Sequence, residues 1–281
     1  MKNLKSRIRV GLLPAIIALL ATSPLCASAE DSTAGSGDLR AAVQNPISSL
    51  VSLPFKFTFD YGAQNGDGTI LNIQPVYPVT KGNWNYVSRL ILPVASVDGA
   101  ISTPENPNPS GLDSASGLGD TNYSLYLSPV KYGEVIWGLG PSIMMPTASD
   151  DQLGSGKWSA GITGVALTQP GWGTMGILGR QLWSFAGDDK HSDVNQSLIE
   201  PFANYNLDKG WFLITDIIIT ANWEAPSNQT WTVPLGGGVG RIYKIGNQAV
   251  NNRVEFYYNV EKPDSAPDWT WAFTFQFLFP K

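Results

Sequence analysis

The sequence predicts an all-β protein: a transmembrane antiparallel up-and-down β-barrel of about 12 strands that follows a cleaved signal peptide. Three observations lead to this fold class. Aromatic residues alternate with smaller or more polar ones at the C-terminus, the N-terminus has the pattern of a secretory leader, and the connections between candidate strands alternate in length and in charge.

The C-terminal stretch from 268 to 281 carries the first signal. Its aromatic residues fall on every second position, at Trp269, Trp271, Phe273, Phe275, Phe277 and Phe279. Successive side chains of a strand point to opposite faces, so these six share one face. A soluble sandwich would cover that face with a second sheet. Almost every other candidate strand has its own apolar face and no helix is available as cover, so we interpret the partner as lipid, which only a closed barrel meets without unpaired backbone edges.

The N-terminus predicts export. Basic residues precede an apolar run over 10–21, at Lys2, Lys5, Arg7 and Arg9. Ala27-Ser28-Ala29 then forms a cleavage signal. We therefore predict a signal peptide over 1–29, a periplasmic N-terminal segment over 30–52, and an outer-membrane β-barrel over 53–281. The only cysteine, Cys26, lies in the part that is removed, so no disulfide is expected.

Composition supports a bacterial outer-membrane location. The chain has 10 Trp, 10 Tyr and 11 Phe, with a mean hydropathy of −0.06. This mixture is typical of barrels in which lipid-facing and lumen-facing residues alternate. The formal net charge is −5, and it becomes more negative once the basic leader is removed. An acidic chain without a basic face is not expected to bind nucleic acid.

Strand-like segments with period-two patterns recur along the chain and are bounded by Gly, Pro and Asn turns. The predicted strands are 53–61, 69–77, 84–94, 121–128, 134–145, 158–168, 174–185, 194–206, 211–221, 231–241, 250–260 and 269–279. The strands containing Pro201 and Pro234 are the weakest members. Before the first strand, Asn45 and Pro46 could start one helical turn, and this segment either lies in the periplasm or folds into the barrel mouth.

The connections between these strands alternate in length. The short ones are 78–83, 129–133, 169–173, 207–210 and 243–247. The long ones are 95–119, 146–157, 186–193, 222–229 and 261–268. The long set holds most of the acids, whereas the short turns carry Lys81, Lys131, Lys209 and Lys244. Short periplasmic turns and longer external loops are typical of outer-membrane barrels.

Several segments resemble one known family. They are residues 153–161 (LGSGKWSAG), 204–207 (NYNL), 231–240 (WTVPLGGGVG) and the end 277–281 (FLFPK). Together they resemble the outer-membrane β-barrel family associated with the meta-cleavage pathway of phenol degradation, over roughly residues 45–281. The resemblance implies a barrel fold and the transport of small organic molecules. Many outer-membrane proteins end on an aromatic residue that the barrel assembly machinery reads, whereas here Pro280 and Lys281 follow Phe279.

The motifs that would indicate an enzyme or a cofactor site are incomplete. Residues 154–157 (GSGK) lack the upstream glycine and the Ser or Thr that a phosphate loop requires. The glycine run 236–240 precedes no helix, so we interpret it as a kinked strand or as close packing. His191 is the only histidine, and its neighbours Ser192 and Asp193 do not make a catalytic triad by adjacency. The acidic loops could bind divalent cations that bridge lipopolysaccharide, although solvated loops explain them too. No catalytic, metal or cofactor residue is predicted.

The polar faces of the strands should line the lumen if the aromatic faces meet lipid. The predicted pore-lining residues are Lys56, Asp60, Arg89, Arg180, Glu200, Asp216, Arg253 and Glu255. Charges in a narrow lumen can select solutes, or they can pair and close the barrel. Twelve strands lie between filled eight-stranded barrels and open porins, so strand number permits a narrow pore.

We therefore hypothesise an outer-membrane channel for passive diffusion of small molecules, aromatic or hydrophobic organics being implied by the resemblance alone. The alternative is a non-conducting structural or surface-contact barrel, and a lipase-like enzyme comes third. Expected partners are outer-membrane lipid and lipopolysaccharide, the barrel assembly machinery and a small-molecule solute.

Overall fold

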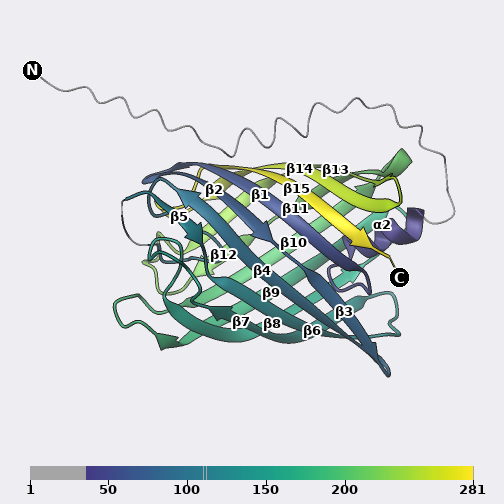
Figure 1. The fold of residues 1–281 in the computed structure, drawn as a ribbon, viewed down its shortest axis with the longest axis horizontal. Helices are drawn as coiled ribbons and strands as arrows, with labels where there is room; N and C mark the ends of the chain where they lie inside the picture. Colours follow the sequence, from purple (N-terminus) through teal and green to yellow (C-terminus); the bar gives the residue numbers. More distant parts are fainter. Residues whose placement is uncertain (1–35, 110, 112, 281) are drawn as a thin grey trace, which may run out of the picture. The chain divides into compact units, whose positions relative to one another are not determined.

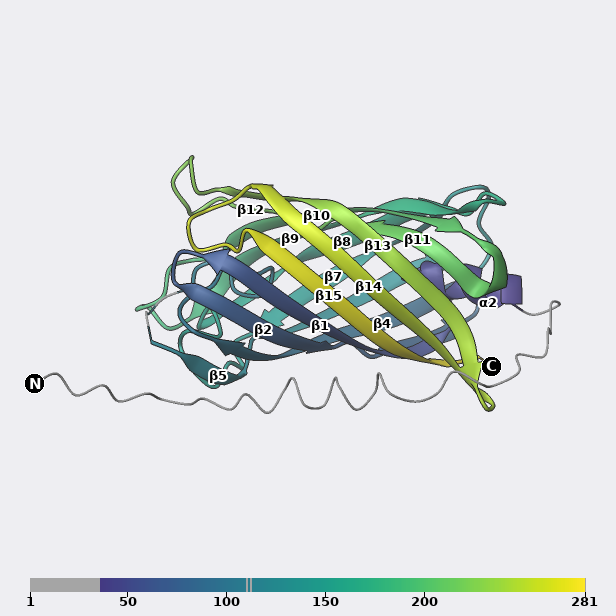
Figure 2. The same cartoon turned by 90° about the horizontal axis from the view of Figure 1, so that it is seen from above.

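The chain forms a closed antiparallel β-barrel in a computed structural model that describes residues 36–109, 111 and 113–280 (Figures 1 and 2). The predicted signal peptide lies outside the described residues. One helix, α2 (Ser36–Gln44), precedes the barrel. The strands are β1 (Val51–Ala63), β2 (Gly66–Ile73), β3 (Val76–Lys81), β4 (Trp84–Val97), β5 (Ala115–Leu118), β6 (Thr121–Pro129), β7 (Ile136–Met145), β8 (Lys157–Thr168), β9 (Gly173–Gly187), β10 (Asn195–Asn206), β11 (Trp211–Asp216), β12 (Ile219–Asn222), β13 (Trp231–Ile245), β14 (Gln248–Glu261) and β15 (Trp269–Phe279).

These strands make a barrel of 12 spanning segments, as the sequence predicts. Three pairs of short strands each act as one interrupted segment. β2 and β3 both lie between β1 and β4, β5 and β6 both pair with β4, and β11 and β12 both lie between β10 and β13. No helix among the described residues is long and apolar enough to cross a membrane.

The barrel closes between its first and last strands. β1 and β15 pair in register from Val51 with Phe279 to Tyr61 with Trp269. The predicted aromatic face of β15 points outward, because Trp271 is 49% exposed whereas its neighbour Ala272 is 3% exposed. The phenylalanines of β1 continue the same outer surface, as the ring contact between Phe57 and Phe273 shows. The alternation predicted at the C-terminus is therefore confirmed.

The interruption between β11 and β12 lies opposite two prolines of the neighbouring strands. Pro201 and Pro234, which weaken the sequence prediction for their strands, lie within continuous strands β10 and β13. The break lies in the segment between those two strands, at residues 217–218, where the N–H of Ile217 donates to the Pro201 carbonyl at 3.1 Å. Proline has no N–H to give to a neighbouring strand, so the ladder on its donor side is interrupted there.

The glycine run in β13 allows close packing. A Cβ atom on Gly240 would lie 2.2 Å from the Phe212 ring, and one on Gly238 would lie 2.7 Å from the Cα of Glu255. These distances leave no room for a larger residue. Of the two interpretations from sequence, close packing inside the barrel accounts for Gly240 directly.

The two ends of the barrel differ (Figure 1). The long connections, including the one that carries β5, lie at one end, and the short turns lie at the other end together with α2. β4 extends to Val97 and β5 begins at Ala115, so the longest connection spans residues 98–114 rather than the predicted 95–119. Charge follows the same division, since the lysines of the short turns face an end opposite to the acidic loops.

The N-terminal segment occupies the short-turn end of the barrel. Leu39, Ala42 and Val43 pack against a buried cluster of Leu50, Ala249 and Leu278. Further along, Ile47 joins the largest buried cluster, which strands β4 and β6 to β10 line from inside. The sequence allows a helical turn that starts at Asn45, but the helix lies before this residue and ends at Gln44. The Asn45 side chain instead accepts a hydrogen bond from the N–H of Ile47 at 3.0 Å. β1 begins at Val51, two residues before the predicted barrel boundary.

Candidate functional site

Three cavities adjoin one another through the described part of the barrel. Their volumes are about 310 Å³ at the loop end, 200 Å³ in the middle and 140 Å³ beside the N-terminal segment. The outer and middle cavities share the side chains of Ser102, Thr220 and Thr232. The middle and inner cavities share Lys56, Gln74, Arg89, Glu200, Asp216 and Arg253. A row of cavities therefore runs from one barrel mouth towards the other, with two sets of side chains as the walls between them.

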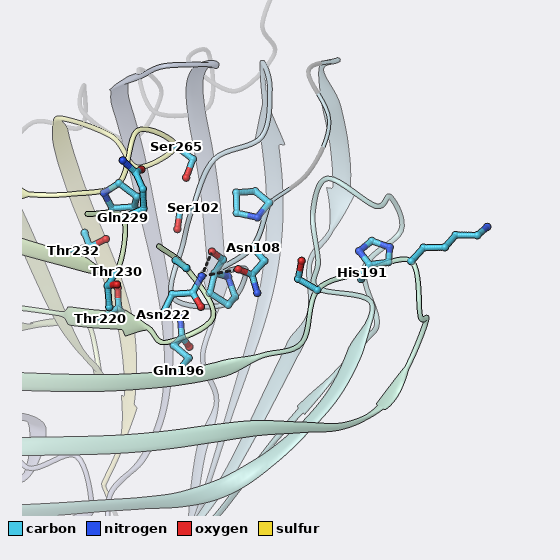
Figure 3. Close-up of a pocket in the computed structure, with 16 residues that line it drawn as sticks. Ser102, Asn108, His191, Gln196, Thr220, Asn222, Gln229, Thr230, Thr232 and Ser265 are labelled. Atoms are coloured by element: carbon cyan, nitrogen blue, oxygen red, sulfur yellow. Dashed lines mark hydrogen bonds between the residues drawn. The ribbon is translucent and has the colours of Figure 1, made fainter. Parts of the chain in front are cut away.

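The outer cavity is lined mainly by uncharged hydrogen-bonding groups (Figure 3). The labelled residues around it are Ser102, Asn108, Gln196, Thr220, Asn222, Gln229, Thr230, Thr232 and Ser265, with His191 at its edge. Asn222 fixes the geometry by donating through Nδ2 to the Pro107 carbonyl at 3.2 Å and to Asn108 Oδ1 at 2.6 Å. These contacts tie the long connection 98–114 to strand β12. The entrance thus offers amide and hydroxyl groups to a solute.

The connection 98–114 folds into the barrel. Ile101 is 2% exposed, and the N–H of Ser102 donates to the Ser265 carbonyl at 3.0 Å. Deeper in the lumen, Arg180 Nη2 donates to the Pro104 carbonyl at 3.1 Å. Burial raises the pKa of the adjacent Glu105 carboxyl, and the opposing charges of Arg180 and Lys56 act against that rise. Glu105 is a lumen residue that the strand pattern did not predict, because it lies in an irregular loop.

The eight residues predicted to line a pore all belong to strands whose polar face points into the barrel. Seven line the middle cavity: Lys56, Asp60, Arg89, Arg180, Glu200, Asp216 and Arg253. The eighth, Glu255, does not line this cavity; its side chain is 1% exposed and forms an ion pair with Arg253. The structure therefore brings the predicted set together in one belt, and its role in selecting solutes stays a prediction.

Part of the charged belt is held in a network of ion pairs and hydrogen bonds. Arg253 approaches Asp216 at 3.6 Å and Glu255 at 3.4 Å. Tyr257 donates through its hydroxyl to Glu255 at 2.9 Å and accepts from the backbone N–H of Asp216 at 3.0 Å. These contacts hold this side of the belt in position, and within them Arg253 Nε and Glu255 Oε2 have no hydrogen-bond partner among the described residues. Tyr257 was not predicted, although its place in the β14 alternation would have identified it.

The opposite side of the belt is less completely paired. Arg89 Nη2 donates to Gln74 at 3.3 Å, and among the described residues Arg89 forms no ion pair closer than 4 Å. β4 carries Arg89, and it lies on the opposite side of the closed barrel from β11, which carries Asp216. Arg180 Nε and Asn72 Oδ1 are buried without a described hydrogen-bond partner. Buried polar groups need such partners, so these atoms are available to water or to a polar solute.

The inner cavity is bounded by the N-terminal segment. Gln44 accepts from Thr174 Oγ1 at 3.0 Å and donates to Asn206 Oδ1 at 2.9 Å. Arg40 donates to the Leu207 carbonyl at 2.7 Å. These bonds fasten the segment to β9, β10 and the turn after β10. The segment narrows the lumen at the short-turn end, while the loop 98–114 narrows it at the other.

The other sequence motifs are held by contacts with neighbouring loop side chains. Ser155, in the GSGK stretch, donates through its N–H and its hydroxyl to Asp120, and Lys157 pairs with Asp193 at 3.4 Å. His191 Nε2 lies 3.8 Å from Asp151, and no serine hydroxyl among the described residues is hydrogen-bonded to it. No group of three His, Cys, Asp or Glu side chains in the described ranges could hold a metal ion.

Aromatic side chains form belts on the outside of the barrel at both ends. At the loop end, exposed rings include Tyr61, Trp183, Trp223 and Trp269, and at the short-turn end they include Trp84, Trp137, Trp172, Tyr205 and Trp211. Exposed aliphatic residues such as Leu139, Ile162, Ile177 and Leu235 lie between these belts. An apolar band between two aromatic girdles is the surface of a barrel in a bilayer. The chain is an outer-membrane β-barrel.

Among solved structures, one outer membrane protein has the same fold. A crystal structure of an outer membrane channel from Pseudomonas putida superposes with a TM-score of 0.58, at 15% identity over 82% of this chain and 96% of the other. Outer membrane phospholipase A from Escherichia coli gives 0.41, at 13% identity over 87% and 98%. A monoaromatic hydrocarbon channel, CymD, gives 0.44, at 7% identity over 91% and 95%. No family model matches the sequence, and no curated protein matches it either.

Proposed function

We propose that this protein is a narrow outer-membrane channel for passive diffusion of small molecules. The observation that carries the proposal is the row of three adjoining cavities, in which charged side chains separate the middle cavity from the inner one. A barrel that serves only as a scaffold has no need for buried charges with free hydrogen-bonding atoms, because each costs desolvation energy. Passage is downhill, since nothing in the described barrel couples it to an energy source.

The solute class is the finer part of the proposal. The sequence resembles a family linked to phenol degradation, and the Pseudomonas putida protein of similar fold is described as a channel. We infer small organic molecules, aromatic ones included, as the solutes. The entrance is lined mainly by uncharged polar groups, with Lys190 as its one lysine. It fits molecules that combine an apolar body with a hydroxyl or carbonyl group, because amide and hydroxyl side chains can bond to such groups without the desolvation cost of a charge.

A non-conducting barrel is the second candidate. Two observations favour it: the N-terminal segment and the connection 98–114 both occupy the lumen, and Arg253 is paired with two carboxylates. In that case the charged belt would hold the barrel closed, and the acidic loops would contact other surface molecules.

Conductance of the refolded protein in a planar bilayer separates these candidates. Stepwise openings support the channel, and silence from protein that migrates as a folded barrel on unheated gels supports the closed barrel. A variant with residues 101–108 replaced by a Gly-Ser linker extends the test. If the loop narrows the conducting lumen, the conductance of this variant should exceed that of the natural chain. Equal conductance would show that the ions do not pass the loop.

Solute specificity needs a separate experiment. Liposomes that contain the protein should take up phenol-like solutes faster than liposomes that contain an unrelated closed barrel. Uptake of ions but not of such solutes would retain the channel and reject the organic solute class.

A further inference from the structure

One charged side chain lies on the lipid-facing wall near the short-turn end. Along β13 the outward positions Leu235 and Val239 are exposed and apolar, and Arg241 follows on the same face by strand alternation. Arg241 stands between Trp211 of β11 and Asn252 of β14 in the strand register. An arginine on this surface requires a polar partner, since a bare charge facing hydrocarbon is costly.

The Arg241 guanidinium lies within cation–π distance of two rings. Its central carbon lies 5.2 Å from the Trp211 ring centroid and 5.7 Å from that of Tyr243. Nε donates to the Lys209 carbonyl at 3.4 Å. Neither terminal nitrogen has a hydrogen-bond or carboxylate partner among the described residues. Stacking and the Nε bond thus orient the guanidinium while its two remaining nitrogens stay free.

Other cations gather around the same turn. Arg40 donates to the carbonyls of Leu207 and Trp211, at 2.7 and 3.4 Å. Lys209 is exposed in the turn, and Lys244 is exposed at the end of β13. Asp208 is the acid of the turn, and in the described structure it forms no ion pair with any of these cations. The cations around this turn, Arg40, Lys209, Arg241 and Lys244, therefore outnumber its one carboxylate.

We propose that this basic rim, made of Arg241, Lys209, Trp211 and Tyr243, binds the phosphate group of an anionic phospholipid in the leaflet at the short-turn end. The terminal guanidinium nitrogens donate to the phosphate oxygens, Lys209 adds charge, and the two rings contact the glycerol and upper acyl chain. A lipid fits better than free phosphate because the site opens on the outer wall of the barrel, within the aromatic belt. The proposal is independent of whether the lumen conducts.

Native mass spectrometry of the folded barrel tests this site. Protein in detergent is mixed with phosphatidylglycerol or with phosphatidylcholine, and the fraction that retains a lipid is measured. The variants are Arg241→Gln, Arg241→Lys and, as a matched control, Lys131→Gln. Lys131 is an exposed lysine of another short turn at the same end, and no ring contact involves it. Migration on unheated gels checks that each variant is folded.

The natural chain should retain phosphatidylglycerol over phosphatidylcholine, and Arg241→Gln should lower that retention about fivefold to tenfold, the worth of one interfacial charge with its hydrogen bonds. Arg241→Lys should lose most of the preference, because an ammonium does not stack as a plane. Lys131→Gln should behave as the natural chain. Equal losses in Lys131→Gln and Arg241→Gln would overturn the site in favour of diffuse charge. Displacement of the lipid by an equal concentration of inorganic phosphate would overturn the lipid as its occupant.

Discussion

Arg89 illustrates how one residue can act at a distance inside a barrel. It projects from β4 into the wall between the middle and inner cavities. Glu200 and Asp216 belong to the same wall and come from strands on the other side of the barrel. A cation on one side of a narrow path and anions on the other create a field across the path. Inside a narrow lumen, where little water and salt separate the charges, such a field is screened less than on a surface.

Replacing Arg89 by alanine should make a conducting channel more selective for cations. Removal of one positive charge leaves the carboxylates of the belt in excess, so we expect the cation-to-anion permeability ratio to rise at least about twofold. Reversal potentials in a salt gradient measure this ratio. Lys131→Ala removes the same charge outside the lumen and should change nothing. An identical shift in both variants would show that surface charge sets the selectivity.

Glu105 predicts a pH dependence. Its pKa is raised by burial, so on acidification this carboxyl takes up a proton at a higher pH than an exposed glutamate does. Loss of its negative charge should move selectivity towards anions as the pH falls through that range. Glu105→Gln should remove this part of the pH response and should show the acid-side selectivity already at neutral pH. An unchanged pH response in the variant would contradict the assignment.

Strand periodicity predicts the lumen residues that lie on strands, but it does not predict those in loops. The eight predicted residues follow from alternation alone, since a residue two positions from an inward neighbour is also inward. Glu105 and Gln44 lie in segments without a strand period, and only the folded connection and the N-terminal helix bring them to the lumen. Long-range contacts of this kind leave no local signal in a single sequence.

At the scale of elements, the face of β15 decides insertion. Phe273 points to lipid and Gln276 lines the inner cavity. Phe273→Arg should destabilise the inserted barrel by about 2–4 kcal/mol if the position lies near the bilayer midplane. Gln276→Arg places the same residue three positions away on the other face and should cost much less. Unfolding by urea in lipid vesicles measures both, and equal losses would reject the facing assignment.

The position of the break between β11 and β12 shows why strand boundaries were harder to predict than strand number. The residues at the break are themselves good strand formers, Ile217 and Ile218. The cause lies on other strands, where Pro201 and Pro234 provide no N–H to the ladder. The break between β2 and β3 differs, because Pro75 lies in the break itself. The sequence shows where the prolines are, but only the strand pairing shows which neighbouring strand loses hydrogen bonds to them.

For the whole molecule, closure of the barrel depends on β1 and β15, which come from opposite ends of the chain. Thr58 and Ala272 are direct partners in this pair and both point inward. Antiparallel partners lie within the Cα separation that a disulfide allows. In protein expressed without residues 1–29, and so without Cys26, Thr58→Cys with Ala272→Cys should form a disulfide on oxidation. Peptide mapping under non-reducing conditions detects it.

The control for closure is a pair that the register separates, Thr58→Cys with Thr274→Cys. Thr274 is the partner of Lys56, so its Cβ lies on a diagonal from that of Thr58 and the bond should form much less efficiently. Equal yields from both pairs would indicate a register other than the one described, or an open barrel.

The N-terminal segment bears on the order in which the molecule is built. Residues 40–44 are made early in synthesis, yet Gln44 bonds to Thr174 and Arg40 bonds to the Trp211 carbonyl, which lies 171 positions later. These contacts require strands that are synthesised and paired long afterwards, and the helix also packs on Leu278 of the last strand. The segment should therefore settle only after β15 has joined β1. Until that moment the newly inserted barrel has a wider bore than the finished protein, so a cell that accumulates half-assembled copies should become permeable to solutes that the mature form excludes.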